Sequence, residues 1–338
     1  MRRLAQLVLL VLVLLVSAAP EPASAQSWNN APESRIVATE RPAPPADWIA
    51  VRGTWLTVHG HPDRRDLLLR LSRHGASSLD TISDALGVPI GDTVHVYVSP
   101  TQEVFRELQP GTPPEWADAT AYPRLGAVYL RDPRIRIATD EPVERTMDHE
   151  FVHVLLGRAF APSDAPRWLQ EGVAQVYSGQ VGPTTTRAIQ EAALRRSLIG
   201  LEALERSFPK RHSLADLAYA ESADFVQFLQ GRYGEGVVTE LVAESRKGHS
   251  LRTAVFEVTG EPFDDVESAW RNRWTAGVGF ATSFLGRFGE YAFGAGGLLL
   301  VVAGIMRRLR FRRRLREMED EEALVDAVVA DMRRHRPN

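Results

Sequence analysis

Two histidines one helical turn apart, with a glutamate beside the first, most constrain what this chain can fold into. They belong to the run His149-Glu150-Phe151-Val152-His153. Residues four positions apart lie on the same face of a helix, so both imidazoles can reach one metal ion. The run therefore predicts a helix that presents two nitrogen ligands on one face.

A carboxylate in a second run completes a possible ligand set. After a short loop rich in proline and alanine, the chain continues as Arg167-Trp168-Leu169-Gln170-Glu171-Gly172-Val173-Ala174. Catalytic zinc commonly takes three protein ligands and keeps a fourth position for water, and two histidines with one glutamate are a recurrent set. A lone histidine is usually a core residue and a lone glutamate a surface one, so this prediction depends on both runs occurring together. We expect His149, His153 and Glu171 to bind Zn²⁺.

Glu150 is the candidate general base beside these ligands. It follows a ligand in sequence but is turned by about 100° around the helix axis, so it can face the water instead of the metal. Zinc lowers the pKa of its water to about 7, and a nearby carboxylate can take the proton as the water attacks a carbonyl. The sequence therefore predicts a zinc-dependent hydrolase.

Together the two runs resemble the gluzincin zinc peptidases, the thermolysin-like clan. Within that clan they resemble the peptidase MA-like domains of many bacterial secreted and membrane-anchored proteins. The similarity extends from about Trp55 to Trp274 and is diffuse outside the motifs. It implies a peptide-bond hydrolase in which the two histidines and Glu171 hold zinc and Glu150 is the base.

The same resemblance adds one candidate residue and one departure. Tyr219-Ala220-Glu221-Ser222 opens a later helix and looks like a recurrent element of these domains, which makes Tyr219 a candidate catalytic residue. In thermolysin-like enzymes an acidic residue one turn after the ligand glutamate orients the first histidine, whereas this chain has Gln175. A glutamine still accepts the imidazole N–H through its carbonyl oxygen, but without the charge.

The N-terminus has the features of a secretory signal peptide over residues 1–25. Arg2 and Arg3 precede an apolar run from Leu7 to Val16, and a small-x-small cleavage site follows at Ala23-Ser24-Ala25. The chain contains no cysteine, which excludes both a lipoprotein cysteine and a disulfide. We expect an exported protein stabilised by core burial alone.

A second apolar segment near the C-terminus predicts one transmembrane helix over residues 286–306. It is followed by Arg307-Arg308-Leu309-Arg310-Phe311-Arg312-Arg313-Arg314. Positive charge collects on the cytoplasmic side, so the tail over residues 307–338, basic and then acidic, should lie inside and the catalytic domain outside. The alternative is a buried core helix followed by a solvated basic helix, because the apolar core is short for a span of about 20 residues.

The charge balance argues against a nucleic-acid partner. Lys+Arg number 40 and Asp+Glu 43, which gives a formal net charge of −3, and the main basic cluster follows Met306. A nucleic-acid-binding domain would carry clustered positive charge, whereas a cluster beside a membrane is better explained by anionic lipid. The expected partners are a peptide or protein substrate and the membrane, and the oligomeric state stays open.

Hydrophobic patterning predicts an α+β fold in which the zinc site lies between a strand-bearing N-terminal part and a helical C-terminal part. A proline-rich linker over residues 26–47 precedes one metallopeptidase domain over residues 48–275. Apolar and polar residues alternate in the expected strands, and apolar residues recur at spacings of three and four residues in the first expected helix. The expected elements are strands at Val51 to Val58, Val94 to Val98 and Ala127 to Leu130, and helices at Arg64 to Leu86 and from Pro142 onward.

The strand at Ala127 to Leu130 comes just before the metal helix. In gluzincins this is the position of the edge strand on which peptide substrates lie, and an exposed edge offers backbone groups that a peptide can join. We therefore expect this strand to be the substrate edge.

The function expected is that of a membrane-anchored extracytoplasmic zinc peptidase. Two alternatives remain open at this stage. The first is an inactive peptidase-like scaffold or binding module. The second is a zinc hydrolase that cleaves a non-protein amide bond, such as a cell-wall cross-link.

Overall fold

A five-stranded mixed sheet forms the N-terminal half of the domain. The computed structural model describes residues 40–115, 117–137, 141–209, 212–275 and 301–311. The strand order is β1-β2-β3-β5-β4, with β2, β3 and β5 parallel and the outer strands β1 and β4 antiparallel to their neighbours. The strands are β1 (Ile49–Arg52), β2 (Leu56–Gly60), β3 (Val94–Ser99), β4 (Ala119–Tyr122) and β5 (Ala127–Arg131).

Two expectations about the strands are wrong. The strand expected from Val51 to Val58 is a hairpin of β1 and β2, because the chain turns at Gly53, whose N–H donates to the Leu56 carbonyl over 2.7 Å. The strand at Ala127 to Leu130 is not an edge, since β5 lies between β3 and β4 and all its residues are buried. The edge strand next to β5 is β4, which the hydrophobic pattern did not predict because its residues Ala-Thr-Ala-Tyr include few large apolar side chains.

Long helices cover one face of the sheet. Val58, Val96 and Val128 are paired neighbours on β2, β3 and β5, and they join one core with apolar side chains of α2 (Arg65–Leu86) and α4 (Val143–Phe160). Helix α2 ends at Gly87, whose φ of 63° is left-handed. The opposite face carries Tyr97 and Tyr129 against α3 (Gln102–Glu107), a short helix that the sequence reading missed.

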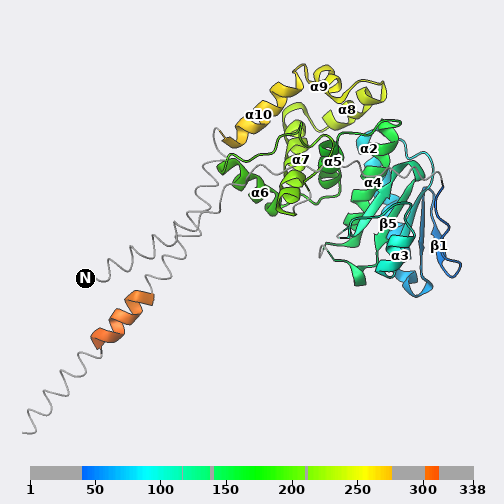
Figure 1. The fold of residues 1–338 in the computed structure, drawn as a ribbon, viewed down its shortest axis with the longest axis horizontal. Coiled ribbons are helices and arrows are strands. Elements are labelled where there is room, and N and C mark those ends of the chain that lie inside the picture. The colour runs from blue at the N-terminus through cyan, green and yellow to red at the C-terminus, as the bar shows by residue number, and fades with distance from the viewer. Residues whose placement is uncertain (1–39, 116, 138–140, 210–211, 276–300, 312–338) are drawn as a thin grey trace, which may run out of the picture.

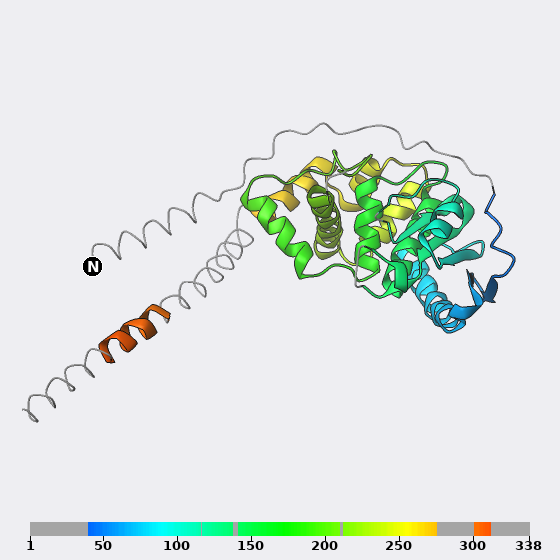
Figure 2. The same cartoon turned by 60° about the horizontal axis from the view of Figure 1, so that its bottom comes forward.

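The C-terminal half is helical, as expected. Both views show the sheet at one end of the domain and the helices over residues 183–194 and 263–275 at the other (Figure 1, Figure 2). Helix α5 packs against both α4 and α7, so it joins the two halves. The helices are α5 (Arg167–Tyr177), α6 (Pro183–Leu194), α7 (His212–Tyr233), α8 (Val237–Arg246), α9 (Leu251–Thr259) and α10 (Phe263–Thr275).

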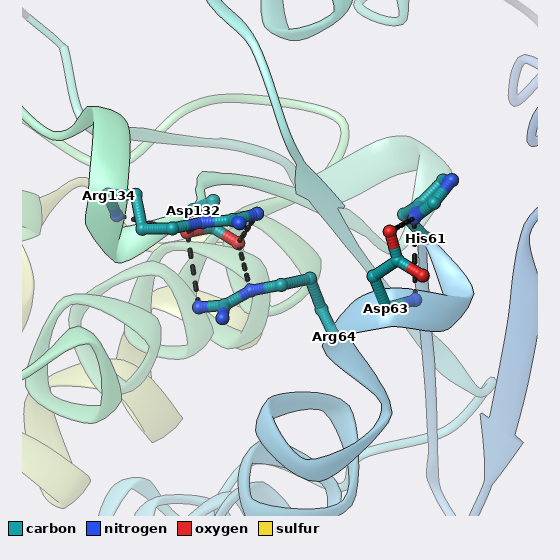
Figure 3. A network of polar contacts seen from close by, with 5 residues as sticks. All are labelled: His61, Asp63, Arg64, Asp132 and Arg134. Carbon is teal, nitrogen blue, oxygen red and sulfur yellow. Dashed lines mark hydrogen bonds and ion pairs between the residues drawn. The ribbon is translucent and has the colours of Figure 1, made fainter.

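A buried carboxylate ties the end of β5 to the start of α2. Figure 3 shows Asp132 between two arginines, with Arg64 Nε donating to its Oδ2 over 2.5 Å and Arg134 Nε to its Oδ1 over 2.9 Å. Burial alone would raise the pKa of Asp132, but the hydrogen bonds from Arg134 and Arg64 lower it below its usual value. The carboxylate therefore stays charged and holds Arg134, just after β5, and Arg64, just before α2.

The segments expected to direct export and membrane insertion lie outside most of the described residues. The signal peptide falls wholly within residues 1–39 and most of the expected span within residues 276–300, neither of which is described. The described residues 301–311 form a helix with exposed apolar and basic side chains. Within the described part of the chain, none of the helices combines the length and apolar character that a membrane crossing requires.

Candidate metal and catalytic site

Helix α4 presents the two predicted histidines on the side opposite its core face. Met147, Phe151 and Leu155 recur every four residues and are fully buried in the core. His149 and His153 lie between them in sequence and therefore point away from the core, with their ring centroids 4.8 Å apart. The helix is thus anchored by one face and offers two imidazoles on the other.

Helix α5 brings Glu171 to these imidazoles. Its Oε2 lies 3.3 Å from His149 Nε2 and 3.5 Å from His153 Nε2. One ligand atom from each of the three residues lies within 4.8 Å of the other two. Two imidazole nitrogens and one carboxylate oxygen gathered at one point match the protein ligands of a catalytic zinc site. The residues therefore fit zinc.

The two oxygens of the Glu171 carboxylate have different partners, because Arg167 binds only one of them. Its guanidinium binds Glu171 Oε1 over 2.8 Å, one helical turn away, and leaves Oε2 facing the imidazoles. Burial would raise the pKa of Glu171, but Arg167 first, and then His153 and His149, hold it well below its usual value. Arg167 belongs to the second motif, but nothing in the sequence alone assigns it this role.

The partner of His149 is Gln180, which corrects the expectation for Gln175. His149 Nδ1 lies 2.7 Å from Gln180 Oε1. After α5 the chain reverses at Gly179, with φ 71°, and the Gln180 N–H donates to the Gln175 carbonyl over 2.9 Å. This turn puts Gln180 back beside the last turn of α5. Helical spacing in the sequence did not predict it, because the residue lies beyond the helix.

The pKa of His149 is raised above its usual value in this setting. Burial lowers it, but the hydrogen bond and the charge of Glu171 outweigh burial. A ligand histidine must lose that proton to bind a metal, so metal uptake at this site releases a proton.

Glu150 lies in the same group of charges, almost fully buried. Burial raises the pKa of its carboxyl, and His153 and His149 partly offset that effect. A carboxylate with a raised pKa is a stronger base than an exposed one. The structure therefore brings the predicted base next to the predicted ligands.

Tyr219 reaches the site from α7. Its hydroxyl is hydrogen-bonded with Arg167, and its ring meets the ring of Phe208 edge to face at 5.0 Å. Burial, and then the charge of Glu171, raise the pKa of Tyr219, so the phenol keeps its proton. Tyr219 therefore lies beside the candidate metal ligands as a hydrogen-bond donor.

The β4 edge of the sheet runs alongside α4, the helix that carries both candidate histidine ligands. At the start of β4, Asp118 accepts the Ile137 N–H over 2.8 Å, and neighbouring Arg136 donates to Thr146 in the first turn of α4 over 2.8 Å. At the other end of β4, a Cβ on Gly157 would lie 2.3 Å from Pro123. Strand β4 therefore passes the turn of α4 that carries both histidines.

Comparison with known proteins gives one family match. A family model described as Peptidase MA superfamily matches residues 76–276. No curated protein matches the chain significantly.

Similar solved structures include two enzymes. The M1 zinc metallopeptidase from Deinococcus radiodurans is 19% identical, with a TM-score of 0.41, over 69% of this chain and 50% of that one. Leukotriene A4 hydrolase from Saccharomyces cerevisiae is 14% identical, with a TM-score of 0.41, over 68% of this chain and 39% of that one. The chain thus spans half or less of the length of these two proteins. The family model covers more than half of the chain, including α4 and α5 with all three candidate ligands, and the chain belongs to the peptidase MA superfamily.

Proposed function

We propose that this chain is a zinc-dependent peptidase, anchored in the cell membrane with its catalytic domain outside the cytoplasm. One observation carries the catalytic part of the proposal. Ligand atoms of His149, His153 and Glu171 lie within 4.8 Å of one another, and Glu150 is buried beside them. A structural zinc site would be closed by four protein ligands, whereas three leave a position for reaction.

Each residue then has a separate task. Zinc held by His149, His153 and Glu171 would supply a Lewis acid and raise the acidity of water. Glu150 accepts the proton of the attacking water, and its raised pKa suits it to pass that proton to the leaving amine. Tyr219 keeps its proton and donates a hydrogen bond to the oxygen on which negative charge develops.

Strand β4 is the proposed substrate edge. It pairs only with β5 in the described sheet, so its other side offers backbone N–H and C=O groups. An extended peptide can add there as a further strand, and most of its contacts would then be hydrogen bonds to main-chain groups rather than to side chains. The position of β4 along α4 supports a peptide bond lying over the histidines.

Membrane anchoring is supported by the sequence features at both chain ends. The apolar run after Arg3 favours export, and the arginines after Met306 favour a cytoplasmic C-terminus. The proposal therefore has the active site facing the extracytoplasmic space, with the tail over residues 307–338 inside.

The test of this function is digestion of a peptide library by the purified chain, with and without a zinc chelator. The matched variant is Glu150→Gln, which keeps the shape of the side chain and removes its basicity. We expect unchanged zinc content and a loss of activity of about 10²- to 10⁴-fold. Cleavage at the parental rate by Glu150→Gln would refute the mechanism. No cleavage of any peptide by a zinc-loaded parent would favour the scaffold, and release of cell-wall amides instead would favour the non-protein substrate.

A further inference from the structure

We infer that Gln180, held in place by Glu141, orients His149 for metal binding and takes over the task that a carboxylate on α5 would have. The inference rests on the proposed zinc site. Two contacts carry it. Gln180 Oε1 lies 2.7 Å from His149 Nδ1, and Gln180 Nε2 donates to Glu141 Oε2 over 2.8 Å.

The donors and acceptors of this chain of contacts can be assigned in only one way. An ionised carboxylate only accepts, so the NH₂ group of Gln180 must face Glu141. The amide oxygen then faces His149, and because it only accepts, Nδ1 must carry the imidazole hydrogen. When the imidazole gives up its second proton for a metal, the lone pair is therefore left on Nε2, the atom that points to Glu171. Glu141 thus selects, through Gln180, the tautomer of His149 that can bind a metal.

Both members of the relay are fixed from outside the site. The left-handed Gly179 and the Gln180 N–H bond to the Gln175 carbonyl hold the glutamine. The Glu141 carbonyl accepts from Arg136, whose other nitrogen donates to Thr146 in α4. The relay is therefore tied to the same helix that carries its target.

The second histidine has no comparable support. Among the described residues, His153 Nδ1 is buried without a hydrogen-bond partner. Of the two imidazoles, only that of His149 is oriented by such a partner. Loss of Gln180 should therefore lower metal affinity directly. Partners of this kind typically contribute 10- to 100-fold to metal binding.

The experiment measures zinc affinity of the purified full chain by competition with a chromogenic chelator. Gln180→Leu removes the acceptor at similar volume, and we expect zinc to bind about 10- to 100-fold more weakly. Gln175→Leu is the matched control at the position used by thermolysin-like enzymes, and it should bind zinc like the parent. Both variants replace a glutamine by leucine, so a difference between their zinc affinities reports the position and not the residue type.

A reversed relay provides the rescue. In the double variant Glu141→Gln with Gln180→Glu, a carboxylate accepts directly from His149 and an amide donates to it, so the same tautomer is selected. We expect zinc affinity at or above the parental value. Gln180→Glu alone puts two carboxylates side by side and should restore less.

Three outcomes would overturn the inference. These are equal zinc affinity of Gln180→Leu and the parent, a loss of zinc affinity in Gln175→Leu equal to that in Gln180→Leu, and failure of the double variant to bind zinc more tightly than Gln180→Leu. A fourth outcome separates the inference from the function. If the parent itself binds no zinc, the proposed function fails. Thermal unfolding of the zinc-free proteins is measured alongside, and a rescue of affinity at unchanged melting temperature excludes a merely structural role.

Discussion

At the scale of single residues, the metal site depends on how one carboxylate is shared. Glu171 gives one oxygen to Arg167 and turns the other toward two imidazoles. The arginine is the largest of the influences that lower the pKa of this carboxyl. It keeps Glu171 ionised, which a zinc ligand must be.

Replacement of Arg167 by methionine should therefore make zinc binding more sensitive to acid. Without the guanidinium the pKa of Glu171 rises, so protons compete with zinc at a higher pH than in the parent. We expect the pH at which half of the zinc is lost to shift upward. Elemental analysis after dialysis across a pH series measures it. Arg195→Met, which removes only an exposed pair at 4.0 Å with Glu191, is the control and should leave the midpoint in place. An unshifted midpoint in Arg167→Met would contradict the role given to the arginine.

Tyr219→Phe should separate catalysis from metal binding. The variant keeps the ring that packs on Phe208 and loses only the hydroxyl. Loss of one donor to a developing negative charge typically lowers kcat by about 10²- to 10³-fold, so we expect a loss of that order with zinc content unchanged. Steady-state kinetics on a peptide substrate and metal analysis together check it. A parental kcat would remove Tyr219 from the mechanism.

Residue by residue, the sequence predicted what helical spacing determines. His149, Glu150 and His153 share one helix, and the second motif was enough to predict that Glu171 would lie beside the two histidines. Gln180 was not predictable, because its approach depends on a reversal after α5 that no spacing rule anticipates. Three-dimensional neighbours from beyond a helix end leave no periodic signal.

At the scale of elements, the site depends on how closely α5 approaches α7. A Cβ on Gly172 would lie 2.3 Å from the Ser222 carbonyl oxygen, which is backbone and has little freedom to move. Gly172 also follows Glu171 directly. The spacing of these two helices therefore sets the position of the third ligand.

Gly172→Ala should accordingly destabilise the fold and loosen the zinc site together. Overpacking of this kind costs about 1–3 kcal/mol, and the shift of α5 moves Glu171 from the imidazoles. Gly231→Ala is the control. Gly231 lies on α7, the helix that Gly172 packs against, and a Cβ there meets nothing within 4 Å. This variant should raise the free energy of unfolding by about 0.5–1 kcal/mol through helix propensity. Urea unfolding and zinc competition measure both effects. Parental stability of Gly172→Ala would mean that the helices can separate freely.

Helix α7 also carries a buried acid that should make stability depend on pH. Glu221 accepts the N–H groups of Ile199 and Gly200 over 2.9 and 3.3 Å, with Arg271 and Glu267 as its charged neighbours. Burial raises the pKa of Glu221 from 4.5 to about 7.

Between these two pKa values the folded chain holds a proton that the unfolded chain has released. Raising the pH through this window therefore destabilises the fold, by up to roughly 3 kcal/mol. Glu221→Gln cannot titrate, so the fall in its free energy of unfolding from pH 5 to pH 8 should be smaller by that amount. Urea unfolding at both pH values provides the comparison. Equal pH dependence of parent and variant would contradict the raised pKa.

Among the elements, those with strong periodicity were predicted and those without it were not. The interval expected for the first long helix, Arg64 to Leu86, matches α2 almost residue for residue, because its apolar residues recur at three and four. Strand β4 and helix α3 were missed, since each is only a few residues long. The hairpin of β1 and β2 was merged into one strand because both halves alternate in the same way.

At the scale of the whole molecule, the α+β division into a sheet part and a helical part is confirmed, and the candidate zinc site lies where they meet. Charge and apolar patterning sufficed for that division because each half has its own period. The order of strands in the sheet did not follow from the sequence, since pairing is decided by contacts between distant segments. The signal peptide, the span and the domain limits stay predictions.

Topology is testable with a reporter that is active only outside the cytoplasm. Fused after Trp274, it should be active, and fused after Glu322, it should be inactive, because the arginines after Met306 favour a cytoplasmic tail. Activity at both positions would mean that residues 286–306 do not span the membrane, and the reverse pattern would mean that they span it in the opposite direction.

The packing of α5 has a consequence for the order of events during folding. All three candidate ligands are synthesised between residues 149 and 171, yet the surface that fixes Glu171 comes later, because Gly172 and Trp168 pack against Ser222 and Phe225 of α7. A nascent chain that ends before α7 has the ligands but not the geometry. Metal capture thus has to wait until α7 docks, and a chain exported unfolded would become active only at its destination.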